Sequence, residues 1–216
     1  MTLLVRTREE LDAATTEPMP TAVVMTMGAL HEGHAQLMRE ARRLVSPQGR
    51  VIVTDFVNPT QFGAGEDFDR YPRTLEADVE VCERNGVDFV LAPSVAEVYG
   101  GSELGITVDP GPRGSILEGA SRAGHFAGVL TVVAKLMHIT GPDIALYGEK
   151  DYQQLVLIRD MARALDFRVQ VVGVPTVREP DGLAMSSRNR YLSPDARARA
   201  AAIPRALDAG RAAAGA

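Results

Sequence analysis

The sequence predicts an α/β fold built on a Rossmann-like, doubly wound parallel sheet. Short apolar runs rich in β-branched residues recur along the chain, and each has about the length of a buried strand. The segments between these runs repeat apolar residues at three- and four-residue spacing, which is typical of helices that bury one face. Strands that alternate with helices favour right-handed crossovers within one sheet, and such sheets bind ligands at the carboxyl ends of their strands.

The expected elements follow in chain order. The apolar runs predict strands at residues 21–27, 50–57, 87–93, 143–148 and 168–174. The longer periodic segments predict helices at residues 33–45, 74–86, 127–140 and 152–166, and Gly86 and Gly141 stand where helices commonly stop. The region from about 93 to 124 contains GGSELG and DPGPRGS, which predict loops together with an edge strand.

The last part of the chain differs in composition. From residue 177 it is first polar and rich in turns, and then becomes an alanine- and arginine-rich helix interrupted by Pro204. This segment has too few large apolar residues to form a core alone. We therefore expect a Rossmann-like domain at residues 1–176 and the beginning of a smaller C-terminal domain at 177–216.

Composition limits the classes of function. The chain has 216 residues, 23 basic and 28 acidic side chains and a net charge of -5, a sign that disfavours binding to nucleic acid phosphates. Cys82 is the only cysteine, so we expect no disulfide and a reducing compartment. No segment reaches the roughly 18 consecutive apolar residues of a membrane span, and the N-terminus lacks a secretory signal pattern. These features predict a cytoplasmic enzyme or binding protein without a membrane partner.

Two histidines follow the first of the expected strands, in the stretch TMGALHEGHAQLM. His31 and His34 fall at the start of an expected helix, where unpaired backbone N–H groups and the helix dipole attract anions. Gly28 and Gly33 allow the backbone to approach a phosphate closely. A zinc site is a weaker interpretation, because HEGH lacks the spacing of an HExxH metalloprotease motif. Packing would be the better interpretation for one histidine, but the context favours phosphate binding by the pair.

Two further clusters follow strands as well. FVNPTQFG places Asn58 and Gln61 after the strand at 50–57, where they could hold a small polar substrate, although a simple Asn-Pro turn explains this stretch better when it is taken alone. YGEKDYQQLVL places Lys150 after the strand expected at 143–148, and its ammonium group suits a phosphate oxygen. Asp151 could accept hydrogen bonds from a ribose, and Gln154 lies one helical turn after Lys150. The acids of this stretch are also those that favour a helix start.

A fourth cluster, GLAMSSRN, combines hydroxyl groups with a guanidinium. Ser186 and Ser187 can donate hydrogen bonds, and Arg188 offers a two-pronged donor for a phosphate. Serine-rich loops that end in arginine are common, so this cluster is weak alone. Four clusters at compatible positions along one fold are much stronger together.

These segments resemble the pantothenate synthetase (pantoate–β-alanine ligase) family. The resemblance runs from about residue 23 to 193 and is carried by TMGALHEGH, FVNPTQFG, RYPRT, GHFAGVLTVVAKL, GEKDYQQLVLIRD and DGLAMSSRNRYLS, in this order. HEGH is similar to the HIGH-type motif of the wider nucleotidyltransferase superfamily, and MSSR occupies the place of its KMSKS-type loop. The resemblance implies that ATP activates pantoate as pantoyl adenylate with release of pyrophosphate, after which β-alanine displaces AMP to give pantothenate.

The resemblance also implies roles for individual residues. His34 corresponds to the proposed proton donor of the family, and His31 and Lys150 accompany it at the phosphates. The implied ATP-binding residues are Met27, Gly28, Ala29, Leu30, His31, Glu32, Gly33, His34, Gly148, Glu149, Lys150, Asp151, Val177, Met185, Ser186, Ser187 and Arg188. The implied substrate-binding residues are Gln61 and Gln154, with Asn58 and Arg122 as further candidates. Mg²⁺ is expected on the ATP phosphates without an assigned protein ligand, and a homodimer is expected.

Departures from the family pattern leave questions for the structure. Asp55 replaces a normally apolar residue in a strand, so we expect it to be exposed, paired or locally shifted. Family members usually continue into a C-terminal domain that covers the active site, of which this chain holds only the start. Two other functions stay open: a nucleotidyltransferase acting on a phosphorylated substrate, and a nucleotide-binding module without catalysis. The glutamines at 61 and 154 argue against the former, since a phosphate would call for more basic side chains.

Overall fold

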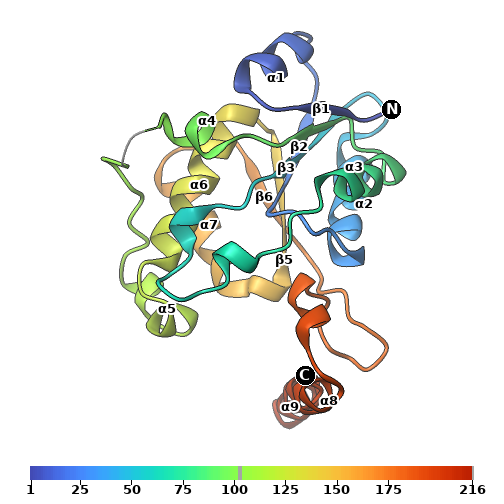
Figure 1. The fold of residues 1–216 in the computed structure, drawn as a ribbon, viewed down its shortest axis with the longest axis vertical. Helices are drawn as coiled ribbons and strands as arrows, with labels where there is room; N and C mark the ends of the chain where they lie inside the picture. The colour runs from blue at the N-terminus through green and yellow to red at the C-terminus, as the bar shows by residue number, and fades with distance from the viewer. Residues whose placement is uncertain (102–103, 216) are drawn as a thin grey trace.

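A computed structural model describes residues 1–101 and 104–215 (Figure 1). Its centre is a six-stranded sheet in the order β1-β4-β3-β2-β5-β6, with every neighbouring pair parallel. The strands are β1 (Leu3–Val5), β2 (Thr21–Thr26), β3 (Arg50–Asp55), β4 (Phe89–Leu91), β5 (Ile144–Gly148) and β6 (Gln170–Val174). The predicted parallel α/β sheet is confirmed. The chain runs from β2 to β3 on one side and later enters β5 on the other, so the strand order reverses beside β2.

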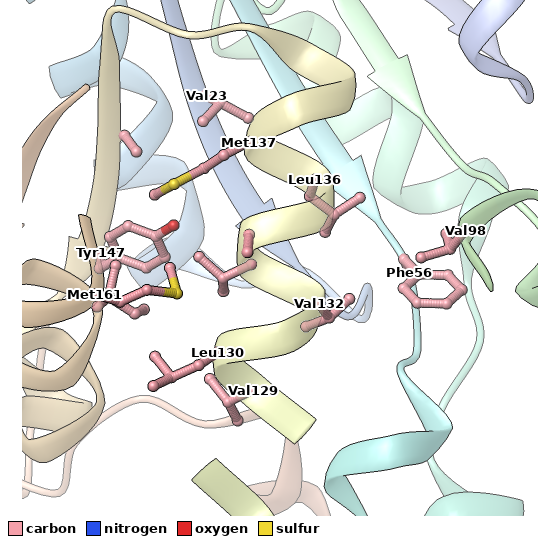
Figure 2. Close-up of a cluster of buried hydrophobic side chains, with 14 of the residues drawn as sticks. Val23, Phe56, Val98, Val129, Leu130, Val132, Leu136, Met137, Tyr147 and Met161 are labelled. Carbon is pink, nitrogen blue, oxygen red and sulfur yellow. The ribbon is translucent and has the colours of Figure 1, made fainter. Parts of the chain in front are cut away.

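Helices cover both faces of the sheet (Figure 1). The α6 (His125–Thr140) and α7 (Tyr152–Ala164) helices pack on one face together with α1 (Arg8–Ala14), and α2 (Glu32–Val45) and α3 (Leu75–Arg84) pack on the other. Strand residues alternate between the two cores: Val23 faces α6, whereas Ala22 and Val24 face α2. Figure 2 shows the α6 side, where Met137 and Tyr147 lie near Val23.

The region before α6 differs from its prediction. The expected edge strand between residues 93 and 124 is wrong, because the described part of that region contains α4 (Val95–Tyr99), a 3-10 turn η3 (Pro112–Ser115) and α5 (Glu118–Ser121), but no strand. Residues 102 and 103 of GGSELG lie outside the described part. The two edge strands of the sheet are β1, which pairs with β4, and β6, which pairs with β5.

The C-terminal segment stands apart from the sheet, at the bottom of Figure 1. After β6 the chain passes through a 3-10 helix, η5 (Ser187–Tyr191), and forms α8 (Pro194–Ala200) and α9 (Ala202–Ala213). The predicted interruption is confirmed, with the junction at Ala201 and Pro204 in the first turn of α9, where proline is tolerated. Ile203 and Leu207 are 60% and 57% exposed, in keeping with a segment that forms no core alone.

Among residues 1–101 and 104–215, no helix is long and apolar enough to cross a membrane.

Candidate functional site

The carboxyl ends of β3, β2, β5 and β6 meet at one cleft of about 410 Å³. This is the edge of a parallel sheet, beside the reversal in strand order, where ligands of such folds bind. All four sequence clusters reach it. The expected site residues that line the cleft are Met27, His31, Gly33, His34, Asn58, Gln61, Arg122, Gly148, Lys150, Asp151, Gln154, Val177, Met185, Ser186, Ser187 and Arg188. The expected ATP-site residues Gly28, Ala29, Leu30, Glu32 and Glu149 belong to the same turns but do not line the cleft.

Each of the two histidine side chains accepts a hydrogen bond from a backbone N–H at the start of α2. His31 is the N-cap residue in extended conformation, and its Nδ1 accepts a hydrogen bond from Gly33 N at 3.1 Å. His34 Nδ1 accepts from His31 N at 3.2 Å, and the ring centroids are 4.1 Å apart. Because a backbone N–H can only donate, neither Nδ1 carries a proton. The proton of each neutral imidazole is therefore on Nε2, the ring nitrogen left for a ligand.

Both imidazoles are neutral at pH 7. Burial, followed by the charges of His31 and Lys150, lowers the pKa of His34 to about 3. Burial also lowers the pKa of His31, and Lys150 acts in the same direction. In the protein without a ligand, the pair thus offers two uncharged Nε2–H donors beside one cationic side chain.

A buried carboxylate accepts hydrogen bonds from the turn between β2 and α2. Gly28 and Ala29 have φ of 79° and 50°, a left-handed pair that brings two consecutive N–H groups to the same side. Asp78, on α3 and 2% exposed, accepts from Ala29 N at 2.9 Å and Leu30 N at 2.7 Å. The N–H groups of Ala29 and Leu30 therefore point to α3 and not into the cleft.

Asp55 lies beside this turn and is paired with Asp78, which was one of the three expected outcomes. A Cβ on Gly28 would lie 2.5 Å from Asp55 Oδ1, so glycine is required there for space as well as for its positive φ. Burial, the charge of Asp78 and a hydrogen bond to Asp78 raise the pKa of Asp55 to about 7. Asp55 is therefore mainly protonated below about pH 7.

The second strand-end turn, after β5, carries two opposite charges. Lys150 Nζ donates to Asp151 Oδ1 at 3.0 Å, and both side chains line the cleft. Gln154 follows on α7, half-buried, and also lines the cleft. The predicted proximity of these three side chains is confirmed by their common position on one wall. Lys150 Nζ can leave Asp151 for a phosphate oxygen at little cost, because the pair is largely exposed.

The MSSR loop closes one side of the cleft through contacts with two distant segments. Ser187 is 8% exposed and donates from Oγ to Ala29 O at 2.9 Å, which ties the loop to the β2–α2 turn. Arg188 forms two bonds with the Asp67 carboxylate, at 2.8 and 2.9 Å, and lies over the Tyr71 ring. In this structure, then, Ser187 binds backbone and Arg188 binds a carboxylate.

Around the predicted residue Arg122 lie groups that the sequence analysis missed. Arg122 is held by Glu66 at 2.6 Å and Glu118 at 2.9 Å, so its charge is already balanced. Next to it, His125 begins α6 and contacts Gln61 O through Nδ1 at 2.8 Å. His125 lies in GHFAGVL, three residues after Arg122. This spacing near the start of a helix is the signal from which His125 could have been predicted as a site residue. Glu118 begins α5, four residues before Arg122, whereas Glu66 comes from a remote loop that no local pattern marks.

Nearly the whole chain matches one known protein family. Residues 3–216 match the sequence profile described as pantoate-beta-alanine ligase. The chain belongs to this family. A Streptomyces coelicolor relative named pantothenate synthetase is 63% identical over 208 residues, covering 96% of this chain and 61% of the relative. This chain therefore spans less than two thirds of the length of that pantoate-beta-alanine ligase relative.

Solved structures of the family agree with the fold. Pantothenate synthetase from Thermus thermophilus has a TM-score of 0.92 at 50% identity, covering 100% of this chain and 76% of that one. The pantoate-beta-alanine ligase from Francisella tularensis, complexed with beta-gamma ATP and beta-alanine, has a TM-score of 0.84 at 36% identity and covers 90% of this chain and 74% of that one. The resemblance noted in the sequence is thereby confirmed at the level of family and fold.

Proposed function

We propose that this chain condenses pantoate with β-alanine to pantothenate at the expense of ATP, through a pantoyl-adenylate intermediate. The observation that carries the proposal is the convergence of four strand ends on one cleft. Neutral imidazole donors, two glutamines and a lysine come together there. Membership of the pantoate-beta-alanine ligase family and the ligands named for the Francisella tularensis relative support the same reaction.

The nucleotide is assigned to the side of the cleft formed by the β2–α2 turn, the β5–α7 turn and the MSSR loop. Nε2–H groups of His31 and His34 would donate to phosphate oxygens, and Lys150 would supply the positive charge. A bound triphosphate places negative charge next to His34, which raises its pKa from the low value of the ligand-free protein. His34 would then donate through Nε2–H at the phosphates while its Nδ1 still accepts from His31 N, in line with the donor role that its family position implies. Asp151 faces the ribose in this assignment.

The first reaction step needs positioning more than a protein nucleophile. A carboxylate oxygen of pantoate attacks the α-phosphorus, and the bond from that phosphorus to the bridging oxygen breaks to release pyrophosphate. Gln61 and Gln154, on opposite walls, would hold pantoate in line for this attack. In the second step the β-alanine amine attacks the acyl carbon, AMP leaves with the acyl oxygen, and the nitrogen loses a proton. Donors fixed beforehand at the phosphates stabilise the charge that moves to the leaving group.

Mg²⁺ accompanies ATP in this proposal. Within residues 1–101 and 104–215, no group of three or more histidine, cysteine or acidic side chains could hold a metal ion. The donor set of the cleft fits a cation bound mainly by phosphate oxygens and water, the usual coordination of Mg²⁺ on a nucleotide. The family resemblance further supports a cytoplasmic homodimer, which light scattering of the purified chain would test.

Product analysis tests the proposed reaction directly. The chain would be incubated with ATP, Mg²⁺ and pantoate, with and without β-alanine, and the products identified by mass spectrometry. We expect pantoyl adenylate and pyrophosphate without β-alanine, and pantothenate with AMP when β-alanine is present. Binding of ATP without formation of either product would refute the reaction and favour a nucleotide-binding module without catalysis.

A further inference from the structure

The Asn58 side chain has only one allowed amide orientation. Its Oδ1 accepts from Thr60 N at 3.2 Å, and its Nδ2 donates to Gly128 O at 3.3 Å. A backbone N–H can only donate and a backbone carbonyl can only accept, so the oxygen and nitrogen of this amide cannot be exchanged. Asn58 is 1% exposed, so water does not offer either atom an alternative partner.

The fixed orientation of Asn58 determines that of Gln61. Asn58 Nδ2 donates to Gln61 Oε1 at 3.1 Å, which occupies the acceptor end of the glutamine amide. Gln61 Nε2 therefore points the other way, and its partner in the structure is Met27 Sδ at 3.2 Å. A thioether is a weak acceptor, so these N–H groups are poorly satisfied. Because Met27 and Gln61 both line the cleft, the amide presents donors, not acceptors, to a ligand.

Tyr99 closes the far end of this chain of hydrogen bonds. It is the last residue of α4, does not line the cleft, and its hydroxyl donates to Asn58 Oδ1 at 2.6 Å. Burial raises the pKa of the Tyr99 phenol, so the hydroxyl stays protonated as a donor. The ring is fixed by Phe56, at 6.2 Å between centroids, and by Lys135 Nζ, at 5.8 Å from the ring centroid.

Helix α6 approaches the same turn closely. A Cβ on Gly128 would lie 2.2 Å from the backbone oxygen of Thr60, so only glycine leaves the α6 carbonyl within reach of Asn58. The Asn58 amide is thus clamped between α4 and α6, and neither contact depends on a ligand.

We propose that Tyr99 is a positioning residue that acts through Asn58 to hold Gln61 with its Nε2 donors facing the cleft, so that the site selects a substrate oxygen acceptor such as a carboxylate. The proposal rests on the proposed ligase function for the identity of that acceptor, pantoate. The orientation itself is a property of the ligand-free protein.

The kinetic test compares Tyr99→Phe, which removes only the phenolic oxygen, with Tyr191→Phe. Tyr191 likewise donates a hydrogen bond through its hydroxyl, but to a backbone carbonyl, Arg70 O at 3.3 Å, and it does not line the cleft. We expect Tyr99→Phe to raise KM for pantoate about fivefold, the effect of one neutral hydrogen bond, while KM for ATP stays unchanged. Tyr191→Phe should leave both KM values unchanged. Equal rises in both KM values for Tyr99→Phe would indicate a general structural role and overturn the proposal.

A double-mutant cycle separates positioning from packing. Because Tyr99 acts through Gln61, adding Tyr99→Phe to Gln61→Ala should change kcat/KM for pantoate by less than twofold relative to Gln61→Ala alone. An effect of the same size in both backgrounds would mean that Tyr99 acts independently of Gln61, and the proposal would be wrong.

A measurement without substrate keeps this proposal distinct from the proposed function. In ¹H–¹⁵N spectra of the ligand-free chain, Tyr99→Phe should shift the side-chain amide signals of Asn58 and Gln61, but not that of Asn85 on the far side of the sheet. Unchanged signals for both would overturn the orientation argument even if the chain is an active ligase. Shifted signals in a chain that forms no pantoyl adenylate would support the orientation and refute the ligase reaction instead.

Discussion

Replacing Asp55 by asparagine should stabilise the protein near pH 8 and leave its stability below pH 3.8 almost unchanged. The reason is that the half-buried Asp55 carboxyl group must lose its proton beside the charge of Asp78 as the pH rises. Asparagine has about the same shape, and its Nδ2 supplies a permanent donor to the Asp78 carboxylate in place of the proton. The substitution also removes a carboxyl group whose ionisation is opposed by burial and by the neighbouring charge.

The sign and size of this stability change follow from the pKa of Asp55. Its folded pKa is about 7 and its ordinary value is 3.8, so between these pH values the folded state binds the extra proton. Stability is therefore fully present below pH 3.8, falls as pH rises towards 7, and is lost above it. A difference of about 3 pH units corresponds to at most about 4 kcal/mol. Partial exposure and coupling to Asp78 reduce the expected gain for Asp55→Asn to about 1–2 kcal/mol at pH 8.

Urea unfolding of wild type and Asp55→Asn at pH 3.8, 5, 6, 7, 8 and 9 would measure this difference in unfolding free energy. We expect the difference to rise between pH 3.8 and about 7 and to stay constant above that range. Asp195→Asn, at an exposed position on α8, is the matched control and should give a flat difference near zero. A flat curve for Asp55→Asn, or a loss of stability at pH 8, would mean that Asp55 is charged in the folded protein and would refute the reasoning.

Three further predictions concern the cleft. His34→Ala should slow pantoyl-adenylate formation about a hundredfold, because it removes an Nε2–H donor at the phosphates; near-normal single-turnover rates would discard that role. Gln154→Ala should weaken pantoate binding more than ATP binding in calorimetry, and equal losses would indicate a structural role. Asp67→Asn should lower KM for ATP about two- to fivefold at low salt, because it releases Arg188 from its carboxylate partner; an unchanged KM at all ionic strengths would mean that Arg188 does not reach the nucleotide.

The sequence predicted the elements that have a strong internal period. Five of the six strands and the α2, α3, α6 and α7 helices were confirmed, with boundaries shifted by no more than two residues. β1 was missed because its three residues are followed at once by charged residues, whereas the equally short β4 lies within a longer apolar run at 87–93. α1 could have been found, because Thr7 and Glu10 form a capping box in which Thr7 Oγ1 accepts from Glu10 N at 3.1 Å.

The site was predictable as far as it depends on strand ends. Residues that follow parallel strands share one edge of the sheet, so His34, Gln61 and Lys150 were expected to converge. Partners that come from remote segments were not predictable in this way. Asp67 lies 121 positions before Arg188, and no pattern in either segment indicates that they pair. The hydrogen bonds that both histidine Nδ1 atoms accept from backbone N–H groups were likewise not predictable, because they depend on the path of the chain at the helix start.

These remote contacts explain how the cleft keeps its shape without a ligand. Ala29 N donates to Asp78 on α3, and Ala29 O accepts from Ser187 in the MSSR loop. One peptide segment at the carboxyl end of β2 is thus fixed from two directions by elements that do not neighbour it in sequence. The histidines that follow are neutral and already oriented, so they can donate to a phosphate without first losing a competing charge or turning. Preparation of this kind is what an adenylation reaction needs, because the attacking carboxylate and the leaving pyrophosphate must be aligned before either bond changes.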